Sequence, residues 1–133
     1  MAINPELLDF EKYARSNPFM YHNHIEIVKV TEESCRVKVT LVHESKNLYG
    51  AVHGGLMYSM ADVVCGIAAR VDGNDYVTQS THMNYLRNTK GDKIYCDTQI
   101  VKRGRTMVII RFQITDDAGR LLADGVIDMI RSK

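Results

Sequence analysis

The chain has 133 residues, enough for one domain with its own hydrophobic core. Lysine and arginine number 17 against 16 aspartates and glutamates, so the net charge of +1 favours neither a nucleic acid nor a membrane as partner. The N-terminal residues lack the apolar run of a signal peptide, and no apolar stretch reaches membrane-spanning length. Three cysteines without a Cys-x-x-Cys pair predict free thiols in a reducing compartment. We therefore expect a single cytoplasmic domain over residues 1–133.

The first predicted element is a short amphipathic helix at Pro5–Ala14, with Asn4 as its N-cap and Asn17-Pro18 as its end. Two runs of alternating polar and apolar residues follow between positions 24 and 42. A polar turn at residues 31–34 joins them, which predicts a β-hairpin.

The only long apolar segment of the chain spans residues 52–71. It contains no proline, and leucine, methionine and alanine dominate it, so the segment predicts a helix. At 100° per residue, one side is bulky and apolar, and the other is small or polar with Asp62 at its centre. An ionised carboxylate on a helix with so few charges is costly unless it is hydrogen-bonded or functional. Asp62 is therefore the main functional lead.

Four more strands are predicted at roughly residues 76–87, 93–102, 106–115 and 121–130. Their connections are short and turn-like, so we expect consecutive strands to pair antiparallel. The fold class is α+β, with one long helix packed against an antiparallel sheet of about five to six strands. One helix cannot cover both faces of such a sheet, so we expect dimerisation through an exposed sheet edge or face.

The start of the long helix carries the sequence His53-Gly54-Gly55. Backbone N–H groups lack intrahelical partners there, the helix dipole is positive, and glycines leave the backbone open, so this end can stabilise an oxyanion. Gly54 and Asp62 are eight residues apart, roughly 12 Å along a helix, so one reacting carbonyl cannot reach both in one chain. Two such helices placed antiparallel about a two-fold axis would bring Gly54 of each chain to Asp62 of the other.

Several motifs resemble the hotdog-fold acyl-CoA thioesterases of the phenylacetate-pathway type: Asn47 with Gly50-x-x-His53-Gly54-Gly55 and Asp62, then Asn84-Tyr85-Leu86-Arg87, Lys90-Gly91-Asp92 and residues 102–106. The resemblance implies a hotdog fold and hydrolysis of an acyl-CoA to coenzyme A and a carboxylic acid. It implies no metal and no redox cofactor. It also implies a homo-oligomer, for which we expect at least a dimer and, beyond it, a homotetramer built as a dimer of dimers.

The resemblance also assigns roles at the start of the helix. The Gly54 N–H would be the oxyanion donor, and Asp62 would be either the nucleophile or the general base that activates water. Asn47 would orient the attacking water or the substrate carbonyl. His53 would support the loop or contact the substrate, in preference to acting as a base.

A further hydroxyl near Asp62 is expected from the strand after the helix. Thr78 and Ser80 both qualify, because residues two apart share a strand face. We prefer Thr78, since the loop before it can vary in length.

Coenzyme A would lie along the segment after the first of the four later strands and along the turn between the next two. The candidate substrate-binding residues are Gly55, Leu86, Arg87, Asn88, Lys102, Arg103, Gly104, Arg105 and Thr106. The cationic side chains of Arg87, Lys102, Arg103 and Arg105 could bind phosphates. Alternatively, Arg103 and Arg105 could simply be solvated at a hairpin tip. Asn88 departs from the proline that many relatives have at this position.

Two other patterns favour structural roles. His22 and His24 have the spacing of a metal pair but no acidic or cysteine partner, so surface histidines are expected. Cys65 lies one turn from Asp62 without a neighbouring histidine, which predicts a small buried residue. Two alternatives to a thioesterase stay open: a non-catalytic acyl-CoA-binding module, and a hydratase or dehydratase of the same fold. The identity of the acyl group is not encoded in any recognisable motif.

Overall fold

The computed structural model of the chain describes residues 1–132. Short helical pieces come first, and one long helix separates a pair of strands from four later ones. In chain order the elements are η1 (Pro5–Leu7), α1 (Phe10–Arg15), α2 (Pro18–His22), β1 (Ile25–Val30), β2 (Cys35–Thr40), η2 (His43–Ser45), α3 (Gly54–Arg70), β3 (Tyr76–Tyr85), β4 (Lys93–Arg103), β5 (Met107–Asp116) and β6 (Leu121–Arg131). Within residues 1–132, no helix is both long and apolar enough to cross a membrane.

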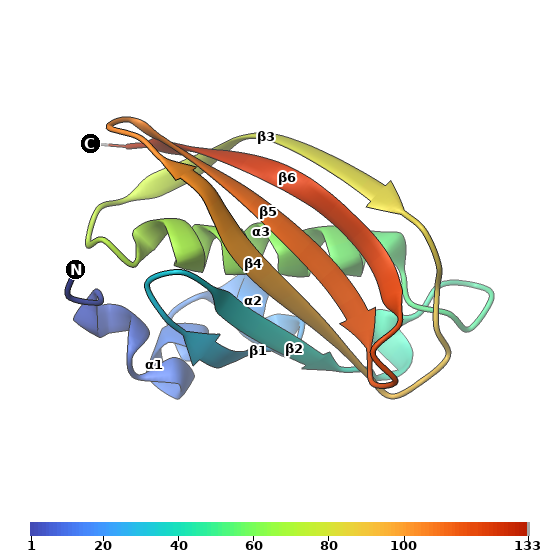
Figure 1. Cartoon of the computed structure of the whole chain (residues 1–133). Coiled ribbons are helices and arrows are strands. Elements are labelled where there is room, and N and C mark those ends of the chain that lie inside the picture. The colour runs from blue at the N-terminus through green and yellow to red at the C-terminus, as the bar shows by residue number, and fades with distance from the viewer. Residues whose placement is uncertain (133) are drawn as a thin grey trace.

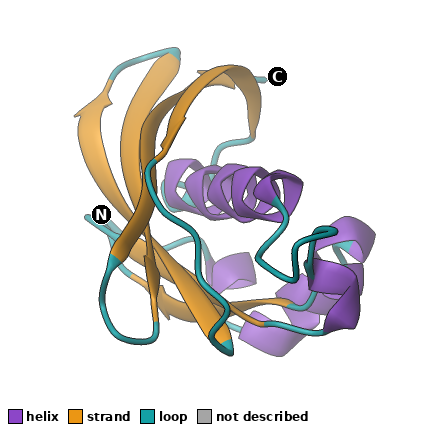
Figure 2. Ribbon diagram, turned by 90° about the vertical axis from the view of Figure 1, so that its right-hand side faces the viewer, coloured by secondary structure: helices purple, strands orange, loops and turns teal. Residues whose placement is uncertain are grey.

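The six strands form one antiparallel sheet in the order β1-β2-β4-β5-β6-β3. The sheet curves around α3, which runs along its concave side (Figure 1, Figure 2). The predicted α+β class and hotdog fold are therefore confirmed.

The apolar side of α3 forms the centre of the hydrophobic core. Every bulky residue predicted for that side is buried: Leu56, Met57, Met60, Val64, Ile67 and Val71. The opposite side is only partly covered, because Tyr58 is 41% exposed and Asp62 is half-buried. The sheet thus covers one side of the helix and leaves the side with Asp62 open.

The expectation that all consecutive strands pair is wrong for β3 and β4. β3 pairs with β6, and β4 pairs with β2 and β5. Residues 86–92 do not form a hairpin turn but run past the ends of β6 and β5 to reach β4 (Figure 1). This crossing leaves β3 at an edge of the sheet with most of its residues exposed. An edge strand has one unpaired row of backbone groups that can accept another chain.

The predicted N-terminal helix is divided into η1 and α1. Asn4 caps η1 as expected, but Asp9 accepts the Lys12 N–H and begins a new helix in the middle of the predicted one. Asn17-Pro18 ends α1 and also begins α2, because the Asn17 side chain accepts a backbone N–H of α2 and proline suits the first helical position.

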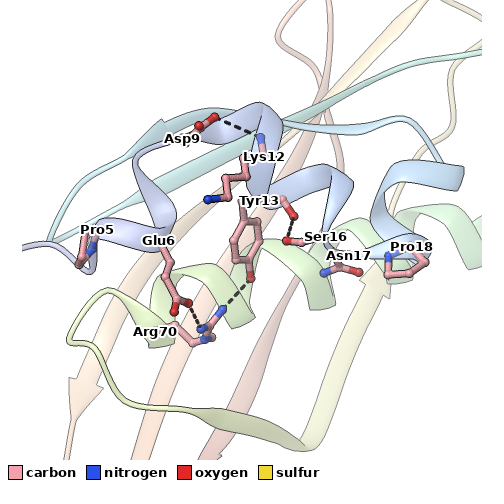
Figure 3. A pocket seen from close by; sticks show the side chains of 9 residues that line it. All are labelled: Pro5, Glu6, Asp9, Lys12, Tyr13, Ser16, Asn17, Pro18 and Arg70. Atoms are coloured by element: carbon pink, nitrogen blue, oxygen red, sulfur yellow. Dashed lines mark hydrogen bonds and ion pairs between the residues drawn. The ribbon is translucent and has the colours of Figure 1, made fainter.

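A contact with α3 fixes this N-terminal segment. The Arg70 guanidinium donates to the Tyr13 hydroxyl at 3.1 Å and to Glu6 at 2.9 Å, within a cavity formed by η1, α1 and the end of α3 (Figure 3). Neither Gly54 nor Asp62 lines this cavity. The cavity is therefore separate from the predicted reaction centre.

Candidate active site

The N-terminus of α3 leaves one backbone N–H open. His53 is the N-cap, and its Nδ1 accepts the Gly55 N–H at 2.9 Å. The Leu56 N–H is bonded to the His53 carbonyl. Among residues 1–132 no acceptor is found for the Gly54 N–H. Of the two glycines predicted to face substrate, Gly54 therefore retains a free donor, and the donor of Gly55 is occupied.

The same contact sets the tautomer of the His53 ring. Since Nδ1 accepts a hydrogen bond, the ring proton of the neutral imidazole lies on Nε2. The side chain thus supports the helix start, which is one of the two roles that the sequence favoured over a general base.

Asp62 lies in the third turn of α3 and faces β3. The Thr78 hydroxyl donates to Asp62 Oδ1 at 2.5 Å. Within the described residues no hydrogen bond to Oδ2 is found, so that oxygen is available to water or a substrate. Charge-assisted hydrogen bonds of this length are strong and fix the direction of the carboxylate.

Ser80 does not reach Asp62, although it was an alternative to Thr78. Its hydroxyl donates to Asp128 Oδ2 on β6 at 2.9 Å. The register of β3 against β6 shifts between Thr78 and Ser80, which marks a β-bulge. An extra residue at a bulge turns the following side chains to the other face, so the expectation of a shared face is wrong here.

The loop before α3 is held by the side chain of Asn47. Its Oδ1 accepts the N–H groups of Tyr49 and Ala51, at 2.9 and 3.2 Å. The Asn47 carbonyl oxygen also accepts the Gly50 N–H. Only the amide nitrogen of Asn47 is left to orient water or a substrate carbonyl, which keeps the predicted role but restricts it to a donor.

The three predicted residues at positions 86–88 are all exposed, and one of them has a side chain hydrogen-bonded within the chain. Leu86 is 56% exposed and Arg87 is also exposed. The Asn88 side chain bonds to the backbone of Val52. The Asn88 side chain therefore has a structural contact, and its predicted contact with substrate stays a prediction.

Arg103, a candidate for phosphate binding, makes several contacts within the chain. Its guanidinium donates to the carbonyl oxygens of Ala68 and Ala69 and to Asp72, each at 2.9 Å. These carbonyls belong to the last turn of α3, where intrahelical donors run out. Arg103 therefore caps the C-terminus of the helix.

Asp72 completes this cap. Partial burial alone would raise its pKa, but hydrogen bonds from Tyr76 and Asn74 and the charge of Arg103 outweigh that effect and lower the pKa below its ordinary value. The carboxylate thus stays charged opposite the guanidinium over the neutral range.

The rest of the predicted turn is open to solvent. Lys102, Arg105 and Thr106 are exposed, and the Gly104 N–H closes the turn on the Met107 carbonyl. This turn lies at the C-terminal end of α3, roughly 25 Å along a 17-residue helix from Gly54. One chain thus does not bring the two predicted parts of the coenzyme A site together.

Cys65 is buried, as predicted. Burial and then the charge of Asp62 hold the pKa of its thiol well above the ordinary value, which leaves it a neutral and unreactive thiol. Within residues 1–132, no cluster of three His, Cys, Asp or Glu side chains could hold a metal ion.

The sequence did not assign Tyr85 any role of its own. Its hydroxyl contacts the Gly54 carbonyl. The only sequence signal was its position within the motif Asn84-Tyr85-Leu86-Arg87.

A six-stranded antiparallel sheet around one long helix, with Asp62 and an open N–H on that helix, is the arrangement expected of a hotdog protein. The family model described as the thioesterase superfamily matches residues 49–123, and the chain belongs to that superfamily. The resemblance drawn from the motifs is confirmed, and with it the expectation of a thioester hydrolase at the level of the family.

Solved structures agree with this assignment. A thioesterase of Haemophilus influenzae is 19% identical with a TM-score of 0.90 and covers 100% of this chain and 96% of its own. The PaaI protein of the E. coli phenylacetic acid degradation operon is 17% identical with a TM-score of 0.89, covering 99% of this chain and 97% of its own. At such identities these two show the fold.

A hypothetical thioesterase of Streptococcus pneumoniae, solved with coenzyme A, is 29% identical with a TM-score of 0.77. It covers 81% of this chain and 85% of its own. Variants of that protein with an aspartate or a threonine replaced by alanine have also been solved, and the two positions are 16 residues apart.

Proposed function

We propose that this protein is an acyl-CoA thioesterase whose active sites form between two copies of the chain. Each site would combine the Gly54 N–H of one protomer with Asp62 of the partner subunit. The observation that carries the proposal is the Asp62 carboxylate, oriented by Thr78 and open at Oδ2 on the uncovered side of α3. The pneumococcal relative supports it, because its altered aspartate and threonine have the same 16-residue spacing as Asp62 and Thr78.

Two routes fit these groups. In the first, Asp62 takes a proton from water, and the water oxygen attacks the thioester carbon. In the second, a carboxylate oxygen of Asp62 attacks the carbon, and the resulting anhydride is then hydrolysed. Both routes pass through a tetrahedral oxyanion that accepts a hydrogen bond from the Gly54 N–H. The C–S bond then breaks, and coenzyme A leaves as a thiolate that takes up a proton. Neither route requires a metal or a redox cofactor.

Distance and exposure support the proposed dimer. Gly54 and Asp62 are roughly 12 Å apart along one helix, too far to act on one carbonyl. The β3 edge and the open side of α3 offer a surface for a second copy. In an antiparallel pair, the turn with Lys102 and Arg105 approaches Arg87 of the partner subunit, so the two parts of a phosphate site meet. We extend the proposal to a dimer of dimers and to the cytoplasm, where the three buried thiols would stay reduced.

A thiol-release assay over a panel of acyl-CoAs tests the chemistry. Asp62→Asn keeps the size of the side chain and removes the base, so kcat should fall by about 10²- to 10⁴-fold. Asp128→Asn is the matched control, because Asp128 also accepts a hydroxyl from β3 but on the outer face, and it should stay within about threefold of wild type. Unchanged hydrolysis by Asp62→Asn would refute the mechanism. Tight binding without turnover would indicate an acyl-CoA-binding module. A change in double-bond absorbance would indicate a hydratase or dehydratase.

Complementation tests the composite site. Gly54→Pro removes the N–H at the first helical position, where proline is tolerated. A heterodimer of Asp62→Asn and Gly54→Pro chains contains one site with both native groups, so it should regain about half of the wild-type activity, while each variant alone stays inactive. If the sites lay within single chains, mixing would restore nothing.

A further inference from the structure

The Gly54 N–H is surrounded by a backbone that has little stiffness of its own. The loop before it contains Gly50 at φ +75°, and Gly54 and Gly55 follow without side chains. Glycine backbones lose more freedom on ordering than any other residue. An oxyanion donor is effective only when its direction is fixed before the substrate arrives. Besides the local contacts of Asn47 and His53, contacts from outside this turn can therefore help to fix it.

The segment after β3 holds it from one side through Asn88. The Asn88 Nδ2 donates to the Val52 carbonyl at 2.9 Å, and its Oδ1 accepts the Val52 N–H at 3.0 Å. One side-chain amide thus satisfies both backbone groups of a residue two positions before Gly54. The Oδ1 atom also accepts the Thr89 N–H at 2.7 Å, which fixes the orientation of the amide itself.

Tyr85 holds the turn from the other side. Its hydroxyl donates to the Gly54 carbonyl at 2.8 Å, and its ring lies against the Gly54 backbone, so that a Cβ added at Gly54 would be 3.3 Å from the ring. Burial and the neighbouring Tyr58 raise the pKa of Tyr85, so its hydroxyl remains protonated and able to donate.

Both side chains are anchored to the sheet. The N–H groups of Leu86 and Arg87 bond to the carbonyl of Leu122, at 2.8 and 3.0 Å, and Leu122 is fully buried on β6. The segment between Tyr85 and Asn88 is therefore tied to a core strand. These contacts connect the start of α3 to a core strand of the sheet.

We propose that Tyr85 and Asn88 are positioning residues that fix the Gly54 N–H toward the oxyanion by holding the backbone on both sides of it. This inference rests on the proposed thioesterase function. The two residues do not contact the reacting atoms. They act only through the backbone from Val52 to Gly54, which their side chains hold. Their loss should lower kcat and leave KM nearly unchanged, because an oxyanion donor acts mainly in the transition state.

The kinetic test compares Asn88→Ala and Tyr85→Phe with Asn84→Ala. Asn84 lies on β3 next to Tyr85, is exposed, and donates a side-chain amide N–H to Asp124, so it is the matched control. We expect kcat to fall by about 10- to 100-fold for Asn88→Ala and about fivefold for Tyr85→Phe, with KM within about threefold of wild type. Asn88→Asp retains the acceptor atom and should recover part of the loss. A kcat within about twofold of wild type for both Asn88→Ala and Tyr85→Phe would overturn the proposal.

A second readout needs no turnover. Hydrogen exchange of the Gly55 amide, which donates to His53 Nδ1, should accelerate at least tenfold in Asn88→Ala while core strand amides remain protected, as followed by NMR. Tyr85→Phe keeps the ring and tests the same point if Asn88→Ala fails to fold. If wild type hydrolyses no acyl-CoA but exchange accelerates as described, the function fails and the positioning stands. If wild type is active and exchange at Gly55 is unchanged in both variants, the positioning fails and the function stands.

Discussion

Arg103→Ala separates a structural arginine from a substrate-binding one. Arg103 is one-fifth exposed, and its guanidinium holds two carbonyls of the last turn of α3 and the carboxylate of Asp72. Hydrogen bonds to charged groups contribute about 1.5–3 kcal/mol each when buried. The partial exposure reduces that value here, and water can replace the arginine at the freed carbonyls.

We therefore expect Arg103→Ala to lower the free energy of unfolding by about 3 kcal/mol, close to the lower limit for breaking a buried ion pair. For a chain of this size that corresponds to a Tm lower by roughly 10 °C. Urea unfolding at one fixed protein concentration measures the change, because an oligomer makes stability depend on concentration. The KM for acyl-CoA should change little.

Arg105→Ala is the control two residues away. Arg105 is exposed, so its loss should change the free energy of unfolding by less than about 0.5 kcal/mol. If the turn contacts phosphates, the KM for acyl-CoA should rise severalfold in Arg105→Ala. A stable Arg103→Ala protein with a raised KM would refute the assignment of Arg103 as a helix cap.

Three further predictions concern the site and the fold. Thr78→Val removes the hydroxyl that orients Asp62 and should lower kcat about tenfold, whereas Thr78→Ser should retain most activity; equal activity in both would contradict the orienting role. Gly125→Ala would place a Cβ 2.5 Å from the Phe112 ring, so we expect a loss of at least about 3 kcal/mol in urea unfolding, and a loss under 1 kcal/mol would contradict it. Because folding lowers the pKa of Asp72, its contribution is fully present above about pH 4 and is lost as pH falls below that value; the stability difference between wild type and Asp72→Asn should therefore shrink from pH 7 to pH 3, and a constant difference would refute it.

The arrangement along α3 could be predicted from the sequence because it depends on short-range geometry. A helix fixes the angle and rise between residues, so the burial of Met60 and Val64 and the place of Asp62 on the opposite side follow from spacing alone. The same reasoning predicted that Gly54 and Asp62 are too far apart to act on one substrate within a chain.

Contacts between distant residues could not be predicted in this way. For the hydroxyl that faces Asp62, the sequence favoured Thr78 but left Ser80 as an alternative, because no pattern in the sequence marks the bulge between them. The role of Arg103 depends on the β4–β5 turn meeting the end of α3, which period and composition do not encode.

The sequence by itself therefore determined the six strands and the long helix, the polar and apolar sides of α3, and which of its residues could carry chemistry. The tertiary structure decided that β3 lies at the sheet edge, that Thr78 orients Asp62, and that Arg103 caps the helix. The reason is physical: spacing along one element sets local directions, whereas the partners of a side chain depend on register and crossover between elements far apart in the chain.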